Sequence, residues 1–153
     1  MSNLKSSENP EVRYAKLMAE LYYFMAHEMV ERMGKDSGGE AISSAINKFG
    51  EARVKAMKAE ANERGLDEDD ITTYAAVRDM PSTGWKYSNN NHLEITYCPM
   101  GDIWSQYGKA GMEVGHLYCA IDNILFESFG MKLERPYCIA KGDKVCKFNL
   151  EKL

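Results

Sequence analysis

Apolar residues recur every three or four positions through the first half of the chain, a spacing that is typical of amphipathic helices. The first run follows residues 9–11, Asn-Pro-Glu, which have the composition of a helix start. Gly34 predicts that this helix ends at residue 33. A second helix is predicted over residues 37–65. An acidic stretch then precedes a short third helix over residues 71–77.

In the second half of the chain the period changes to two, which indicates strands. Residues 85–87 and 92–98 form the first predicted hairpin, with an asparagine-rich turn at 88–91. A second hairpin is predicted near the C-terminus, with strands over residues 131–140 and 144–150.

Two helices separate the hairpins, one over residues 100–107 and a longer one over residues 111–129 that Gly130 closes. The order of elements needs no parallel β-α-β unit. We therefore predict an α+β fold in which N-terminal helices are followed by hairpin, helices and hairpin, with an antiparallel sheet and helices packed on one side. We expect a flexible tail over residues 1–8 and a single α+β domain over residues 9–153.

The composition is that of one ordinary globular domain: the chain has 153 residues, of which 44% are hydrophobic and 27% are charged. A net charge of −4 argues against nucleic-acid binding. The chain has no apolar run long enough to cross a membrane and no N-terminal stretch resembling a signal peptide. We therefore expect a cytoplasmic protein whose four cysteines are free thiols or ligands rather than disulfides.

Three cysteine motifs provide the candidate chemistry. Cys98 precedes a proline at a strand end, where functional groups are common. Cys119 and Asp122 are three apart on a predicted helix, and His116 precedes Cys119 by the same interval, so the three share one face. Cys146 follows a Gly-Asp turn. If these motifs meet in the fold, the thiols offer a nucleophile or metal ligands.

Each motif also has a purely structural explanation, because free cysteine is among the most often buried residue types. Asp122 argues against simple packing, since a carboxylate beside a buried face needs a partner. Cys138 alternates with apolar neighbours, so we expect it to have no polar contacts and no role. His92, next to the asparagine turn, is expected to be solvated, and Trp104 to pack or to line a pocket near Cys98.

The order of the motifs resembles that in the L-2-amino-thiazoline-4-carboxylic acid hydrolase family. The resemblance rests on Cys98-Pro99, on the stretch from Tyr118 to Asp122 and on the stretch from Gly142 to Phe148. Residues 46–53 are similar to the helical part of the same family. The C-terminal hairpin is also similar to small domains related to vinyl reductases, which use cysteines for a metal or bind small ligands.

The family resemblance implies hydrolytic opening of a small cyclic C–N/C–S substrate such as a thiazoline carboxylate. The implied catalytic residues are Cys98, Cys119, Asp122 and Cys146, and the implied substrate-binding residues are His116, Trp104 and Arg53. Arg53 would clamp a carboxylate if it points inward, and Asp122 would act as acid or base or hold the amidine of the ring.

Two other functions remain open at this stage. In a metal-dependent version Cys98, Cys119 and Cys146, with His116 or Asp122, would hold zinc or iron; otherwise we expect no cofactor. In a non-catalytic version the chain is a sensor domain that binds a small molecule in an apolar pocket. The partner is a small molecule in each case, and the broad apolar faces of the helices are compatible with a homodimer.

Overall fold

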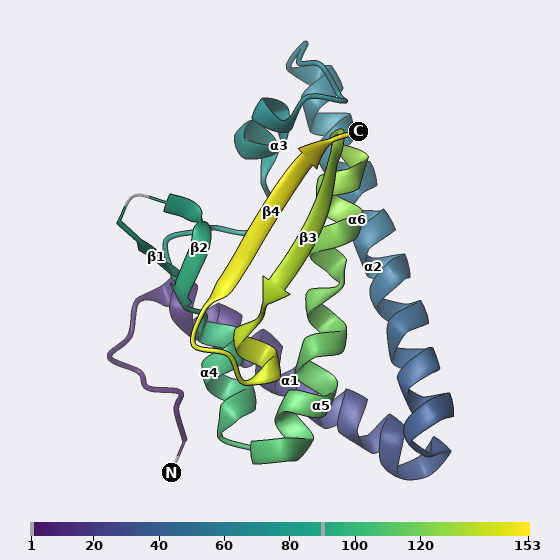
Figure 1. Ribbon diagram of the computed structural model, residues 1–153, viewed down its shortest axis with the longest axis vertical. Coiled ribbons are helices and arrows are strands. Elements are labelled where there is room, and N and C mark those ends of the chain that lie inside the picture. The colour runs from purple at the N-terminus through teal and green to yellow at the C-terminus, as the bar shows by residue number, and fades with distance from the viewer. Residues whose placement is uncertain (1, 90) are drawn as a thin grey trace.

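The computed structural model describes residues 2–89 and 91–153 (Figure 1). Met1 of the predicted tail and Asn90 of the predicted turn lie outside the described residues. The elements, in chain order, are α1 (Pro10–Met33), α2 (Lys35–Glu63), α3 (Ile71–Val77), β1 (Lys86–Ser88), β2 (Asn91–Tyr97), α4 (Pro99–Ser105), α5 (Gly108–Cys119), α6 (Ile121–Ser128), β3 (Met131–Tyr137), the 3-10 turn η1 (Ile139–Lys141) and β4 (Cys146–Lys152).

The strands form one antiparallel sheet in the order β1-β2-β4-β3. Strand β4 therefore lies between the two predicted hairpins and joins them, with Ile95 of β2 opposite Cys146. Helices α2, α5 and α6 lie behind β3 and β4 on one side of the sheet (Figure 1). The predicted α+β fold is confirmed.

Trp104 anchors the helices to one another. Its side chain is almost fully buried, and its indole Nε1–H donates a hydrogen bond of 3.0 Å to the carbonyl of Ala19 in α1. Helix α5 approaches the indole so closely that a Cβ on Gly115 would lie 2.6 Å from the ring. The absence of a side chain at this position lets α4 and α5 pack together, which fixes Cys98 and Cys119 at neighbouring places in the core.

The single helix predicted over residues 111–129 is wrong, because the chain forms two helices that meet at Ala120. In a continuous helix the carbonyl of Cys119 would accept from the Asn123 N–H. Instead it accepts from Arg135 at 3.0 Å, and Asn123 N–H donates to Ala120. A tertiary hydrogen bond thus breaks the helix, which sequence periodicity does not reveal.

The C-terminal hairpin also differs from its prediction. Strand β3 ends at Tyr137 and β4 begins at Cys146, so both strands are shorter at the turn than expected. The connection is a compact loop in which Asp143 accepts a hydrogen bond of 2.8 Å from the N–H of Cys138. Gly142 adopts a φ of 98°, a conformation that favours glycine. The loop turns Cys138 back toward Cys146.

Residues 2–8, which we expected to be flexible, have defined partners. Lys16 in α1 is only 1% exposed, and its ammonium lies 2.5 Å from Glu8 and 3.1 Å from Asp102. It also donates to the carbonyl of Asn3 at 2.6 Å. This network ties the N-terminal segment to α1 and α4.

Within the described part of the chain, no helix has both the length and the apolar character that a membrane span requires.

Candidate functional site: a cavity lined by thiols and arginines

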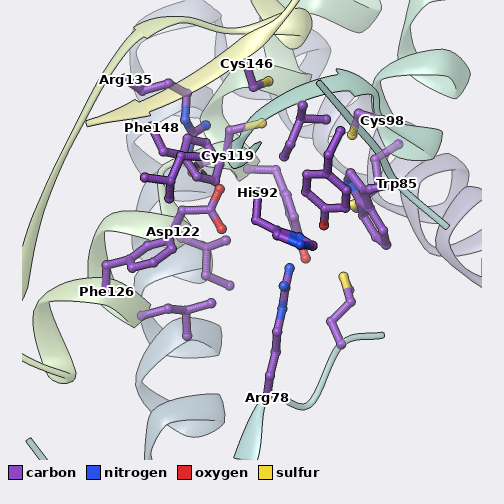
Figure 2. A pocket seen from close by; sticks show the side chains of 18 of the residues that line it. Arg78, Trp85, His92, Cys98, Cys119, Asp122, Phe126, Arg135, Cys146 and Phe148 are labelled. Carbon is purple, nitrogen blue, oxygen red and sulfur yellow. Dashed lines mark hydrogen bonds and ion pairs between the residues drawn. The ribbon is translucent and has the colours of Figure 1, made fainter. Parts of the chain in front are cut away.

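A partly enclosed cavity of about 120 Å³ lies where the sheet meets α4, α5 and α6 (Figure 2). An apolar cavity of roughly 150 Å³ holds benzene, so this one has the size of a single small ring. Its wall is mostly aromatic and aliphatic. Its polar and charged groups are Arg53, Tyr74, Arg78, Tyr87, His92, Cys98, Tyr118, Cys119, Asp122, Arg135 and Cys146.

Six of the seven site residues predicted from the sequence contribute to this wall; they are Cys98, Cys119, Asp122, Cys146, Trp104 and Arg53. The seventh, His116, is not among the lining residues, and its Nδ1 lies 2.9 Å from the carbonyl of Met112 one turn earlier in α5. A continuous helix would place His116 and Asp122 on one face. Helix α5 ends just before Ala120, so the two side chains lie on different helices. The structure thus brings the three motifs together without the imidazole.

Asp122 and Arg135 form the central ion pair of the site. Nη2 of Arg135 lies 2.5 Å from Oδ2 of Asp122 and also donates to the carbonyl of Cys119. Within residues 2–89 and 91–153, Oδ1 of Asp122 accepts no hydrogen bond, and Asp122 lines the cavity. Burial raises the pKa of Asp122, and the positive charges of Arg135, Arg53 and Arg78 oppose this effect. The carboxylate is therefore held rigidly and is more basic than an exposed aspartate.

Three cysteines, Cys119, Cys138 and Cys146, form a thiol trio beside this pair. The Cys138 sulfur contacts the thiols of the other two and lies 3.9 Å from Nη1 of Arg135. The N–H of Ile139 donates to the Cys146 sulfur at 3.2 Å. Our prediction that Cys138 lacks polar contacts is wrong, because the loop after β3 turns it toward Arg135.

The thiol trio is arranged to share one thiolate. Hydrogen bonds from Cys119 and Cys146, together with the charge of Arg135, lower the pKa of Cys138. The same contact with Cys138 raises the pKa of Cys119 and of Cys146, and burial adds to both shifts. Cys119 and Cys146 line the cavity whereas Cys138 lies behind them. The contacts within the trio therefore favour ionisation at Cys138 and protonation of the two thiols that face the cavity.

Cys98 has a different local role. It ends β2, and its sulfur accepts a hydrogen bond of 3.4 Å from the N–H of Gly101 in the first turn of α4, where Pro99 begins the helix. Burial raises the pKa of Cys98. This thiol is a helix cap on the cavity wall and is protonated at neutral pH.

The arginines on the wall differ in their partners. Arg53 binds both carboxylate oxygens of Asp79, at 2.6 and 2.8 Å. Arg78 makes no ion pair with any described residue, and its side chain points into the pocket opposite Asp122 (Figure 2). The hydroxyl of Tyr118 is buried at the cavity without a hydrogen-bond partner in the described chain. Arg78 and Tyr118 thus join Oδ1 of Asp122 and Nε of Arg135 as polar groups at the cavity that lack a partner within the described residues.

Sequence reasoning missed four of these residues: Arg78, Tyr118, Arg135 and Cys138. Tyr118 stands directly before Cys119 in one of the quoted motifs, which is a signal for it. Arg78 and Cys138 depend on how the loops fold, and Arg135 depends on how strand β3 packs against α6. Within the described residues, no group of three or more His, Cys, Asp or Glu side chains is arranged to hold a metal ion.

Comparison with known proteins gives one family. The model of the L-2-amino-thiazoline-4-carboxylic acid hydrolase family matches residues 14–150, which is nearly the whole chain. No curated protein and no solved structure shows a significant match.

The shared thiolate leads to a testable prediction. The ultraviolet absorbance of the folded protein should show one thiolate per chain at neutral pH, although free cysteine titrates near a pKa of ~8.5. Cys138→Ser should remove this signal because the charge rests on that sulfur, while Cys98→Ser should keep it. A thiolate signal that appears only above the ordinary cysteine range would contradict the arrangement.

Proposed function

Because the chain belongs to the L-2-amino-thiazoline-4-carboxylic acid hydrolase family, we propose that it hydrolyses a small ring in which one carbon is bonded to sulfur and to nitrogen. The observation that carries this proposal is Asp122, whose carboxylate has one oxygen bound by Arg135 and the other free toward a ring-sized cavity. Asp122 activates water and passes a proton to the departing sulfur, to which the cavity-lining thiols donate hydrogen bonds.

Asp122 is placed for general base catalysis. Burial raises its pKa and with it its basicity, while the positive charges of Arg135, Arg53 and Arg78 favour its ionised form. Water attacks the ring carbon, and its first proton passes through Oδ1 to the ring nitrogen. The carbon–sulfur bond then breaks as the carbon–oxygen double bond forms, and the ring sulfur leaves as a thiolate.

The second half of this reaction needs a proton for the departing thiolate. The proton of the attacking water's remaining O–H passes through Asp122 to that sulfur as the carbon–oxygen double bond forms. Cys119 and Cys146, whose pKa values are raised, keep their protons and donate S–H hydrogen bonds to the departing sulfur at the cavity wall. Direct attack by a cavity thiol is less favourable, because the raised pKa values leave little thiolate on the sulfurs that face the ligand.

We assign substrate binding to two residues that the sequence does not indicate, Arg78 and Tyr118. Arg53 was expected to clamp a carboxylate, but it is occupied by Asp79. Arg78, which has no carboxylate partner among the described residues, is available for an anionic group on the substrate. The hydroxyl of Tyr118 provides a hydrogen bond inside the cavity.

A binding domain without catalysis is the second candidate, and the apolar character of most of the wall favours it. In that case the ligand would bind in the same cavity and leave unchanged. The two functions differ in whether the purified protein releases a free thiol from a 2-aminothiazoline carboxylate. The metal content of protein that does so also tests whether zinc or iron takes part.

Replacing Asp122 tests the proposed base directly. Asp122→Asn should lower kcat by roughly 10²- to 10⁴-fold, the usual contribution of a general base. The control is Asp69→Asn, the same change at a carboxylate that is 84% exposed. The assay follows thiol release, and circular dichroism establishes that each variant is folded. A folded Asp122→Asn protein with full activity would overturn the role of this residue.

Replacing Arg78 tests substrate binding. Arg78→Gln should raise KM by roughly 10-fold or more and leave kcat nearly unchanged, because a charged hydrogen bond to the substrate is lost. Arg64→Gln serves as the control, since Arg64 pairs only with Glu60 and a backbone carbonyl at the surface. An unchanged KM for a carboxylate substrate would exclude Arg78 as its anchor.

A further inference from the structure

Helix α1 carries an exposed apolar stripe. Tyr14, Leu17, Leu21, Phe24 and Met25 are between 47% and 73% exposed. Tyr14 and Leu21 are seven residues apart, as are Leu17 and Phe24, so the stripe follows the repeat of a helix-pairing seam. The C-terminal part of α1 lies at the opposite end of the molecule from α3 (Figure 1).

The area of this stripe is large for a monomer surface. Side chains of this size present roughly 150–250 Å² each, so five that are this exposed provide about 600 Å² of apolar surface. A standard interface buries about 800 Å² per partner. The stripe with its flanking residues therefore approaches what one side of a stable dimer requires, and it exceeds the scattered apolar exposure of ordinary surfaces.

We propose that α1 packs antiparallel against α1 of a second copy of this chain, about a two-fold axis close to Leu21. This inference does not depend on the proposed function. A two-fold axis makes the interface self-complementary, so each contact occurs twice. Leu21 then meets its own symmetry mate, and Leu17 lies level with Met25 of the partner subunit.

The charges beside the stripe fit this pairing. Arg13 lies on one flank, and its Nε is buried without a hydrogen-bond partner in the described chain. Glu31 is exposed on the same flank near the other end of α1 and makes no ion pair with a described residue. At about 1.5 Å per residue, Arg13 is about 12 Å before Leu21 and Glu31 about 15 Å after it. Antiparallel packing therefore brings Arg13 level with Glu31 of the partner subunit.

The shape of the surface beside α1 is consistent with the same alignment of the two α1 helices. A hollow of about 380 Å³ lies between the N-terminal segment and α1, lined by Leu4, Lys5, Ser6, Arg13, Tyr14 and Leu17. Met25 of the partner subunit is level with this hollow. A membrane is a poorer occupant, because helices that bind lipid surfaces carry mainly basic flanks. Glu20 and Glu31 lie on one flank of this stripe with Arg13, and Glu28 and Arg32 lie at its C-terminal end.

The first test is the molar mass of the full-length chain by light scattering over a wide range of concentrations. The wild type should form a dimer, and Leu21→Glu should shift the protein to a monomer because it buries two carboxylates at the axis. Leu153→Glu is the matched control, since that leucine is 71% exposed and lies outside α1. A wild type that is monomeric at every concentration, whether or not it binds lipid vesicles, would overturn the proposal.

The second test exchanges the charges of Arg13 and Glu31. Only a second copy of this chain carries both substitutions, so only that partner can restore the pairing. Arg13→Glu and Glu31→Arg should each weaken the dimer, since each places like charges together. The double variant should restore the dimer toward the wild-type dissociation constant. Both substitutions are on the helix surface, so folding is measured by thermal unfolding for each. Folded single variants that dimerise like the wild type, or a double variant that stays monomeric, would contradict the antiparallel pairing.

Discussion

The ion pair between Asp122 and Arg135 is the constraint on which the site depends. It joins the first turn of α6 to β3, and the same guanidinium binds the carbonyl of Cys119 and lies beside Cys138. Buried ion pairs cost desolvation energy and seldom add much net stability. Here the ion pair determines where neighbouring groups lie. One arginine fixes the carboxylate of Asp122, the break between α5 and α6, and the thiol trio.

This arrangement explains how the cavity can combine a base with hydrogen-bond donors. The carboxylate of Asp122 and the sulfur of Cys138 lie against a single guanidinium, so neither is free to move into the cavity. The carboxylate keeps one oxygen for the ligand, and the thiols in front of the thiolate keep their protons. Arg78 and the hydroxyl of Tyr118 also line this cavity. A base, hydrogen-bond donors and an anion-binding group thus surround a space of one ring.

The sequence predicts the elements well because their periodicity and end signals are local. Pro10 and Gly34 bound α1, and the change to period two marks the strands. The sequence also identifies six of the residues that line the cavity, since Cys98, Asp122 and Cys146 lie within compact motifs. The predictions that were wrong concern contacts between residues far apart in the sequence. Arg135 donates a hydrogen bond to the carbonyl of Cys119, sixteen residues away, and this bond breaks a helix that periodicity predicts to be continuous. Cys138 and Arg78 enter the site through loop geometry, which residue spacing does not encode.

The pH dependence of kcat/KM tests the central claim most directly. The ionised form of Asp122 is the active one, and burial raises its pKa above the ordinary aspartate value of ~3.9. Activity should therefore be complete at neutral pH and should fall, as the pH decreases, at a pH above that ordinary range while the protein is still folded. Activity that persists undiminished into the ordinary aspartate range would contradict a buried carboxylate as the base.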